Sequence, residues 1–130
     1  MTKRAADAST ATCEFWWDER GFVHAVMRTG CEMALSDAQE NVAAIYELGG
    51  RKRNRVLVDM RGVRSQSREA RQYFAGPEAE KATLAVALLN GSPVSRVLAN
   101  FFLRLNPQRI PTALFTDEAA ALAWLMEFRP

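Results

Sequence analysis

Short apolar runs alternate with helix-spaced apolar positions along most of this chain. Apolar and β-branched residues are concentrated at 55–60 and 83–90, and charged or turn-forming residues bound both runs. Such runs are typical of buried parallel strands. The aromatic-rich segment 13–27 predicts two further strands around the turn Glu19-Arg20-Gly21. A last strand is predicted in the segment TALF, directly before Thr116.

The turn of the hairpin decides which side chains share a face. Side chains alternate between the two faces of a strand, so a two-residue turn predicts one face with Phe15, Trp17, Phe22, His24 and Val26. The opposite face would then carry Trp16, Val23, Ala25 and Met27. If a hairpin is apolar on both faces, either other elements of the chain cover both faces or one face is exposed and available to a partner.

Helical spacing follows each of the later strands. We expect a helix at 36–50 with Ser36 or Asp37 as its N-cap, and a second helix capped by Ser65 or Ser67 and interrupted at Gly76-Pro77. A third helix starts at Ser92-Pro93, and a fourth is capped by Thr116.

Apolar residues of the third helix recur at helical spacing. They predict one face packed against the sheet, formed by Val94, Val97, Leu98, Phe101 and Leu105. Arg96, Asn100 and Arg104 follow each other at intervals of four on a different face.

The resulting order is β-β-α-β-α-β-α-β-α, a hairpin followed by strand–helix units. This order predicts an α/β fold with a mixed, mostly parallel sheet and helices packed on it. A chain of 130 residues is long enough for one domain. We expect that domain at 13–130, preceded by a flexible lead-in at 1–12.

Composition places the chain among ordinary globular proteins, with 48% apolar and 25% charged residues. The longest apolar run, 119–126, is far shorter than the ~20 residues that a membrane span needs. The N-terminal segment is polar and lacks an apolar signal-peptide core, so we expect a cytoplasmic protein. His24 is the single histidine and no Cys-x-x-Cys pair accompanies it. No metal site or cofactor is therefore predicted.

Basic residues are concentrated between Arg51 and Arg71. This segment holds eight basic residues (51, 52, 53, 55, 61, 64, 68 and 71) and two acidic ones, although the whole chain has a net charge of only +2. The strand at 55–60 separates the basic residues into two groups by roughly 20 Å. The first group also lacks interleaved aromatic residues, so we interpret it as a solvated loop rather than a nucleic-acid site.

The residues that follow the parallel strands are the candidate site. In open α/β sheets, ligands bind beyond the carboxyl ends of the strands, near helix N-termini. Arginines and serine-capped helix starts at that edge would suit a phosphate or a carboxylate. The alternative interpretation is that the same serines serve as helix caps alone. The edge comprises Asp59, Arg61, Arg64, Arg68, Asn90, Ser92, Ser95 and Arg96, together with Ser65 and Ser67.

Catalysis is not favoured by these residues. No hydroxyl nucleophile has an evident base beside it, because His24 lies in the hairpin. We therefore expect a non-catalytic protein. Large apolar residues without an evident core position form a candidate homodimer surface, namely Trp16, Met27, Phe102 and Leu103.

Two stretches resemble a known family. VLVDMRGV (56–63), and AVALLNGSPVSRVLANFF leading into PTALFTDEAAALAWL, are similar to the SpoIIAA-like, or STAS, fold. The chain resembles in particular small uncharacterised bacterial STAS-like proteins, over roughly residues 13–128 by element order.

The resemblance implies a regulatory or protein-binding module. The best-known STAS domains are anti-sigma-factor antagonists that are switched by phosphorylation of a serine at the start of the second helix, in an Asp-Ser-Ser/Thr-Gly motif. Here the strand ends in Asp59 with Gly62-Val63 following, but the helix start reads Ser65-Gln66-Ser67-Arg68 and lacks that motif. Ser65 and Ser67 are the candidate switch residues.

The implied partner is a protein, such as a kinase-like or sigma-pathway regulator, or a second copy of the chain. The alternative function is the binding of a small anionic or amphipathic ligand at the carboxyl edge of the sheet. The related lipid-binding CRAL-TRIO domains also suggest a small apolar ligand.

Overall fold

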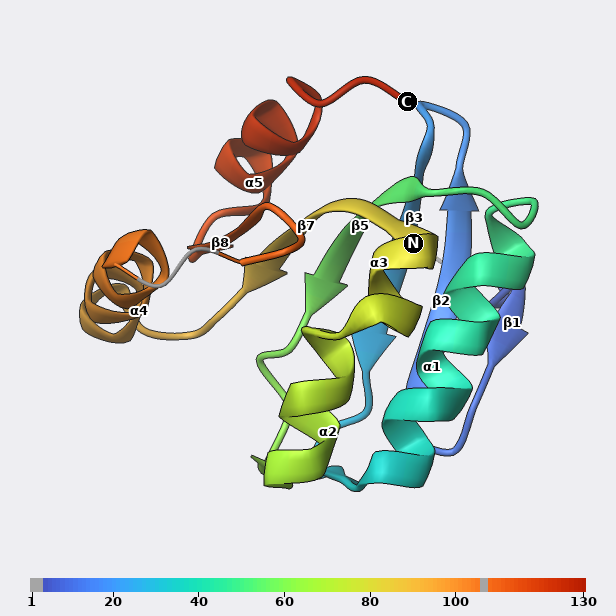
Figure 1. Ribbon diagram of the computed structural model, residues 1–130, viewed down its shortest axis with the longest axis horizontal. Coiled ribbons are helices and arrows are strands. Elements are labelled where there is room, and N and C mark those ends of the chain that lie inside the picture. The colour runs from blue at the N-terminus through green and yellow to red at the C-terminus, as the bar shows by residue number, and fades with distance from the viewer. Residues whose placement is uncertain (1–3, 106–107) are drawn as a thin grey trace.

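The computed structural model describes residues 4–105 and 108–130 of the chain. Its strands are β1 (Ala8–Ser9), β2 (Cys13–Asp18), β3 (Phe22–Met27), β4 (Glu32–Met33), β5 (Asn54–Asp59), β6 (Ser65–Gln66), β7 (Thr83–Leu89) and β8 (Thr112–Phe115). Its helices are α1 (Leu35–Leu48), α2 (Arg68–Phe74), α3 (Pro77–Ala82), α4 (Pro93–Leu105) and α5 (Glu118–Leu125) (Figure 1). Within the described ranges, no helix is sufficiently long and apolar to cross a membrane.

A mixed six-stranded sheet organises the chain, in the order β1-β2-β3-β5-β7-β8. The pairs β1–β2 and β2–β3 are antiparallel, and the pairs from β3 to β8 are parallel. A hairpin followed by parallel strand–helix units was predicted, and the sheet confirms it. The short parallel pair β4–β6 forms a separate small sheet.

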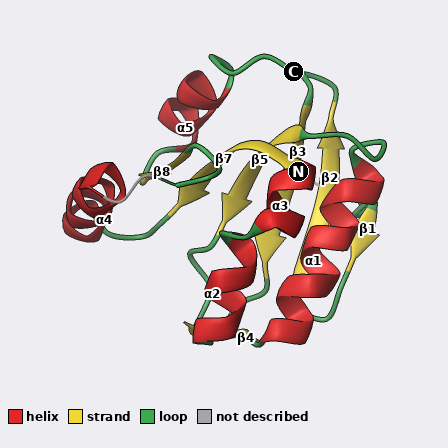
Figure 2. Cartoon of the chain, in the orientation of Figure 1, coloured by secondary structure: helices red, strands yellow, loops and turns green. Residues whose placement is uncertain are grey.

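Helices cover the two faces of the sheet unequally. The helices α1, α2 and α3 lie on one face, and α5 lies on the other (Figure 2). Val42 and Ile45 of α1 pack with Phe15 and Val58 in the first core. Ala121 and Leu125 of α5 form the second core with a group that includes Phe22, Leu57, Ala85, Ala87 and Leu89.

The faces of the hairpin differ from the prediction. Residues 19–21 connect the strands, and Asp18 pairs with Phe22 and Trp17 with Val23. The loop is therefore one residue longer than the two-residue turn on which the face assignment rested. One extra residue exchanges the faces of the second strand, so Val23 joins the core that contains Phe15, whereas Phe22 packs against α5.

Residues 4–12, expected to be part of a flexible lead-in, are held against the hairpin. Strand β1 pairs with β2, and the backbone N–H of Trp17 donates to an Asp7 carboxylate oxygen at 2.8 Å. The indole Nε1 of Trp16 donates to the carbonyl of Arg4 at 3.0 Å. Thr10 and Asn41 join this segment to α1 through a side-chain hydrogen bond. The domain thus begins before residue 13.

Helix starts follow the expected chemistry with shifts of one or two residues. Ser67 caps α2, because its hydroxyl accepts a hydrogen bond from the backbone N–H of Ala70 at 3.0 Å. Asp117, rather than Thr116, caps α5 in the same way. Neither Ser36 nor Asp37 is the N-cap of α1; Ala34 occupies that position, and its N–H donates to the Asp37 carboxylate at 2.9 Å.

Arg55 was interpreted as part of a solvated basic loop, but it is only 8% exposed. Its guanidinium donates to the carbonyls of Gly21 at 3.0 Å, Phe128 at 3.1 Å and Arg20 at 3.2 Å. It therefore ties the hairpin loop to the segment that follows α5. A buried cation at that place has a structural role and adds no charge to a surface patch.

Candidate functional site

Sheet register brings the carboxyl ends of three parallel strands to one edge. Asp59 of β5 pairs with Leu89 of β7, and Leu89 pairs with Phe115 of β8. The N–H of Asn90 also donates to the carbonyl of Phe115 at 2.8 Å. The segments that follow the three strands therefore start side by side, which is the geometry on which the predicted ligand edge depends.

At this edge, the side chains of Asp59 and Arg61 form a salt bridge. Two guanidinium nitrogens of Arg61 donate to the two carboxylate oxygens of Asp59, at 3.0 and 2.8 Å. These hydrogen bonds are the main reason why the pKa of Asp59 lies below its ordinary value, against the opposing effect of burial. Because Asp59 neutralises the charge of Arg61, this pair adds no net positive charge that would attract an anionic ligand to the edge.

The turn after β5 requires a glycine. A Cβ at Gly62 would lie 2.9 Å from the Cα of Thr29, and the N–H of Gly30 donates to the Gly62 carbonyl at 2.7 Å. The close approach of two backbones therefore explains the Asp-x-x-Gly-Val sequence that carried the family resemblance.

The two candidate switch serines have different environments. Ser65 is exposed in β6, whereas Ser67 is half-buried and its hydroxyl caps α2. Arg64 and Arg68 are exposed on either side of them. Ser65 is thus an accessible serine with the exposed residues Arg64 before it and Arg68 after it.

The residues after β7 form the other part of the predicted edge. The Asn90 side chain accepts a hydrogen bond from the N–H of Gly91 at 2.7 Å, as in a local turn. The carbonyl of Ser92 accepts the first helical hydrogen bond, from the N–H of Arg96. Arg96 is half-buried, and its Nε has no hydrogen-bond partner in the described part of the chain. The side chain of Ser95 lies outside the described residues.

The structure describes the surroundings of three of the four side chains of the predicted dimer surface. Trp16 is 7% exposed, and its ring lies 6.1 Å from that of His24. Met27 is half-buried against the first core, and Leu103 is half-buried in α4. The side chain of Phe102 lies outside the described residues. Trp16 therefore cannot offer a large contact area without movement of the residues that cover it.

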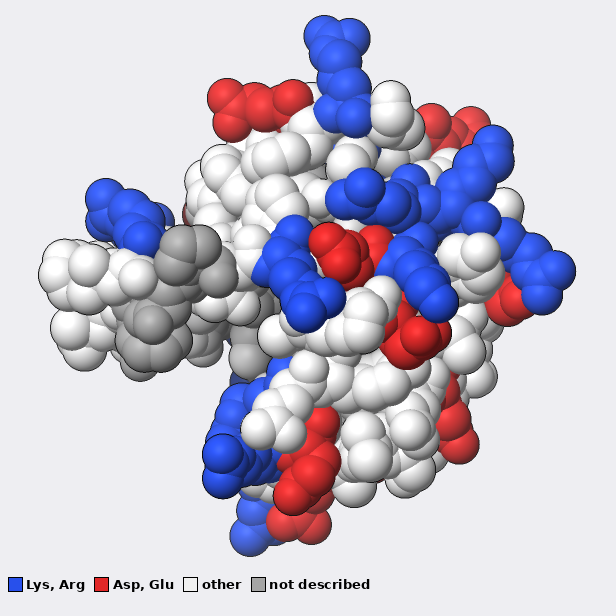
Figure 3. All heavy atoms as spheres, in the orientation of Figure 1, with Lys and Arg blue, Asp and Glu red and all other residues white. Residues whose placement is uncertain are grey.

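The exposed apolar surface lies instead on α4, where the predicted packing is wrong. Helix α4 projects from the β8 side of the sheet (Figure 1), and in Figure 3 its described surface is mainly uncharged. The residues expected to face the sheet have exposed fractions of 57% to 70%. They are Val94, Val97, Leu98, Phe101 and Leu105, which we call the α4 apolar face.

A polar contact explains this orientation. Asn100 Nδ2 donates to the carbonyl of Leu114 at 2.9 Å, and Asn100 Oδ1 accepts from the N–H of Leu114, also at 2.9 Å. Because β8 is an edge strand, Leu114 has no further strand to pair with on that side. Asn100 supplies both missing hydrogen bonds, so the polar side of α4 faces the sheet edge and its apolar side faces outward.

The size of this face matches that of the largest apolar patch on a typical monomer. Full burial of one such side chain corresponds to about 100 Å² of apolar area, so five of them exposed to this extent present roughly 300 Å². The largest patch on a typical monomer covers about 300–600 Å² and is often functional. The sequence contained a signal for the polar side of α4. Arg96 and Asn100 are four residues apart, so they lie on one side of the helix, just as the apolar residues lie on another.

Comparisons with known proteins place these features in a family. The model of a domain of unknown function, DUF7793, matches residues 15–129. No curated protein matches the chain. A protein of unknown function from Arthrobacter sp. FB24 is 37% identical over 86% of this chain and 97% of its own, with a TM-score of 0.34.

Two solved structures share the fold at low identity. An uncharacterised protein of the DUF3478 family from Shewanella loihica PV-4, with a SpoIIAA-like fold, is 16% identical and has a TM-score of 0.61, over 91% of this chain and 98% of that one. The anti-sigma factor antagonist SpoIIAA in its unphosphorylated form is also 16% identical, with a TM-score of 0.56 over 88% and 97%. The predicted fold is confirmed: the chain belongs to the DUF7793 family and has a SpoIIAA-like fold.

Proposed function

We propose that this protein is a non-catalytic regulatory module of STAS type that binds a protein partner through the α4 apolar face. The SpoIIAA-like fold supports a regulatory module in general terms, because one structure with this fold is an anti-sigma factor antagonist. The observation that carries the proposal is the outward orientation of five apolar side chains on one helix.

The chemistry of α4 defines the partner. An amphipathic helix binds by placing its apolar face in an apolar groove. The sequence of α4 contains Arg96 and Arg104 but no acidic residue. A groove with acidic residues at its rim would therefore complement this helix in both shape and charge. The apolar area of roughly 300 Å² is less than half of the ~800 Å² that each partner buries in a standard interface, and a polar rim supplies the rest.

The experiment is site-specific photo-crosslinking in the cells that produce the protein. A photoreactive residue replaces Leu98 in one variant and Gln39 in the other; Gln39 is an exposed residue of α1. We expect a discrete crosslinked protein from position 98 and none from position 39. The identified protein is then purified and titrated with wild type and Leu98→Glu, which should weaken binding at least a hundredfold by placing a charge in an apolar contact.

Three results would contradict the proposal or change it. Equal crosslinking from both positions would mean that α4 is no specific contact. Equal binding of wild type and Leu98→Glu would exclude the apolar face from the interface. A crosslinked product at twice the mass of the chain would identify a second copy as the partner, and sedimentation equilibrium would then give its dissociation constant.

A second element of the proposal concerns the serines before α2. Ser65 is the better candidate for phosphorylation, because its side chain is exposed and lies between the exposed residues Arg64 and Arg68, whereas the Ser67 hydroxyl is engaged as a cap. We expect Ser65→Asp to change the affinity for the crosslinked partner and Ser67→Asp to change mainly the stability of α2. Unchanged affinity in Ser65→Asp would remove the switch from the proposal without affecting the role of α4.

A further inference from the structure

A cavity of about 220 Å³ lies between the sheet and the helices α1–α3. It exists because the end of the sheet near β7 and β8 lacks a covering helix. On β7, Ala85, Ala87 and Leu89 are buried against α5, whereas Val86 and Leu88 on the opposite side are only half-buried. The helices α2 and α3 are short, and α4 lies along the edge of the sheet.

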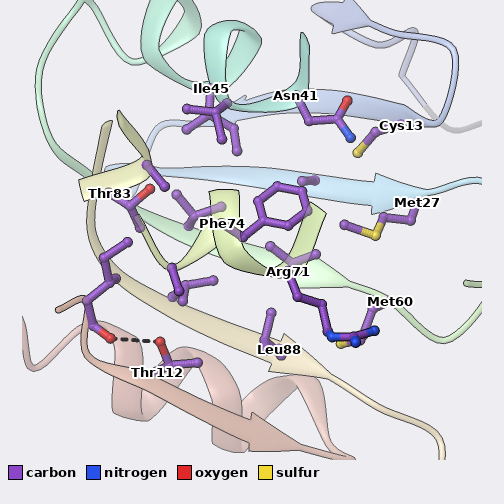
Figure 4. A pocket seen from close by; sticks show the side chains of 18 of the residues that line it. Cys13, Met27, Asn41, Ile45, Met60, Arg71, Phe74, Thr83, Leu88 and Thr112 are labelled. Carbon is purple, nitrogen blue, oxygen red and sulfur yellow. Dashed lines mark hydrogen bonds between the residues drawn. The ribbon is translucent and has the colours of Figure 1, made fainter. Parts of the chain in front are cut away.

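The interior of this cavity is apolar. Its walls include Phe15 and Val58 from the sheet, Ile45 from α1 and Phe74 from α2. In Figure 4, Ile45 and Asn41 lie on one side, Leu88 and Thr112 lie on the other, and Phe74 projects between them. The pKa of the Cys13 thiol, which lines the same space, is raised to about 12, mainly by burial. The cavity therefore offers mainly apolar walls to an alkyl chain.

Two polar side chains of the lining, Asn41 and Thr112, already have hydrogen-bond partners. Asn41 Nδ2 donates to the Thr12 hydroxyl at 3.0 Å, and Asn41 Oδ1 accepts from Thr10. The Thr112 hydroxyl donates to the carbonyl of Ile110 at 2.7 Å. Because these polar groups are already hydrogen-bonded within the protein, the apolar walls determine which ligand the cavity can bind.

One charged residue lines the cavity in the described part of the chain, and it is Arg71. Arg71 is exposed on α2, and one of its guanidinium nitrogens donates to the carbonyl of Gln66 at 2.7 Å. This hydrogen bond ties the guanidinium to the segment that precedes α2. No ion pair of Arg71 occurs among the described residues. Its remaining N–H groups can therefore bind an anion at the cavity mouth.

We propose that the cavity binds a medium-chain carboxylate, with the hydrocarbon tail among the apolar walls and the carboxylate on Arg71. An apolar cavity of about 150 Å³ in another protein holds benzene, which has six carbons, so a cavity of 220 Å³ holds about nine by the same ratio. Decanoate, with nine carbons beyond its carboxylate, is the matching probe. This site is separate from the α4 apolar face and does not depend on the function proposed for it.

The test is isothermal titration calorimetry with sodium decanoate and with decylamine, which has the same chain length and the opposite charge. We expect decanoate to bind with a stoichiometry of one and decylamine to bind at least tenfold more weakly. Arg71→Gln should weaken decanoate binding about tenfold or more, because it removes a charge-assisted contact. Arg68→Gln, an exposed arginine on the same helix that does not line the cavity, is the control and should bind like wild type.

Methyl NMR spectra of the wild-type protein locate the ligand without any substitution. Decanoate should shift the signals of Ile45, Val56 and Val58, which line the cavity, and leave Leu57 and Leu125 on the opposite face unchanged. The absence of binding would overturn the proposal, as would equal affinity of wild type and Arg71→Gln. Shifts confined to Val97 and Leu98 would also overturn it, because they would place the alkyl chain on α4.

Discussion

The orientation of α4 leads to a direct comparison of one substitution at two positions. Leu98 is 67% exposed, whereas Leu89 is 1% exposed in the core formed with α5. Burial of a whole leucine side chain is worth about 1.5–3 kcal/mol, so the buried third of Leu98 contributes less than about 1 kcal/mol. Leu98→Ala should therefore lower the free energy of unfolding by about 0.5 kcal/mol. Leu89→Ala should cost about 3–5 kcal/mol, because it also leaves a cavity.

Urea unfolding followed by circular dichroism at micromolar protein concentration measures both variants under identical conditions. A cost of 2 kcal/mol or more for Leu98→Ala would refute the reasoning, because it would show that α4 packs its apolar face on the sheet. Repeating the measurement at a tenfold higher protein concentration tests whether the protein self-associates through Leu98. A cost that increases with concentration would indicate that a second copy covers Leu98, since self-association stabilises the folded state by mass action.

Three other substitutions test the contacts that position these surfaces. Asn100→Ala should cost about 1–3 kcal/mol in chemical unfolding, since both backbone groups of Leu114 lose their partner; a neutral result would mean that α4 is held in another way. Arg55→Leu should cost about 1–2 kcal/mol by leaving half-buried carbonyls without a donor, whereas the exposed Arg53→Leu should stay within about 0.5 kcal/mol. The pKa of Cys13, raised from 9.0 to about 12, means that folding favours the neutral thiol. Its stabilising contribution is complete below pH 9 and is lost as the pH rises towards 12, so the stability difference between wild type and Cys13→Ala should decrease over that range. Equal differences at pH 8 and pH 11 would contradict this.

The sequence was sufficient to predict the five longer strands, the helices and their order, but not the two-residue strands β1, β4 and β6. The apolar runs at 55–60 and 83–90 can be satisfied only by burial on both faces, and short connections fix which strands become parallel neighbours. Local chemistry also restricted the cap of α2 to Ser65 or Ser67, because a capping hydroxyl contacts a backbone N–H only three residues away, as Ser67 does. Such features depend on nearby residues, so they can be deduced from the order of the chain.

The two surfaces to which we assign a function by proposal could not be deduced in this way. Amphipathic spacing shows that α4 has an apolar face, but the direction of that face depends on the hydrogen bonds between Asn100 and Leu114. Similarly, Arg71 was one of many basic residues in its segment, and its place at the mouth of an apolar cavity depends on residues from several strands and helices. Periodicity describes how side chains are arranged around one element, whereas exposure and cavities depend on which other elements pack against it.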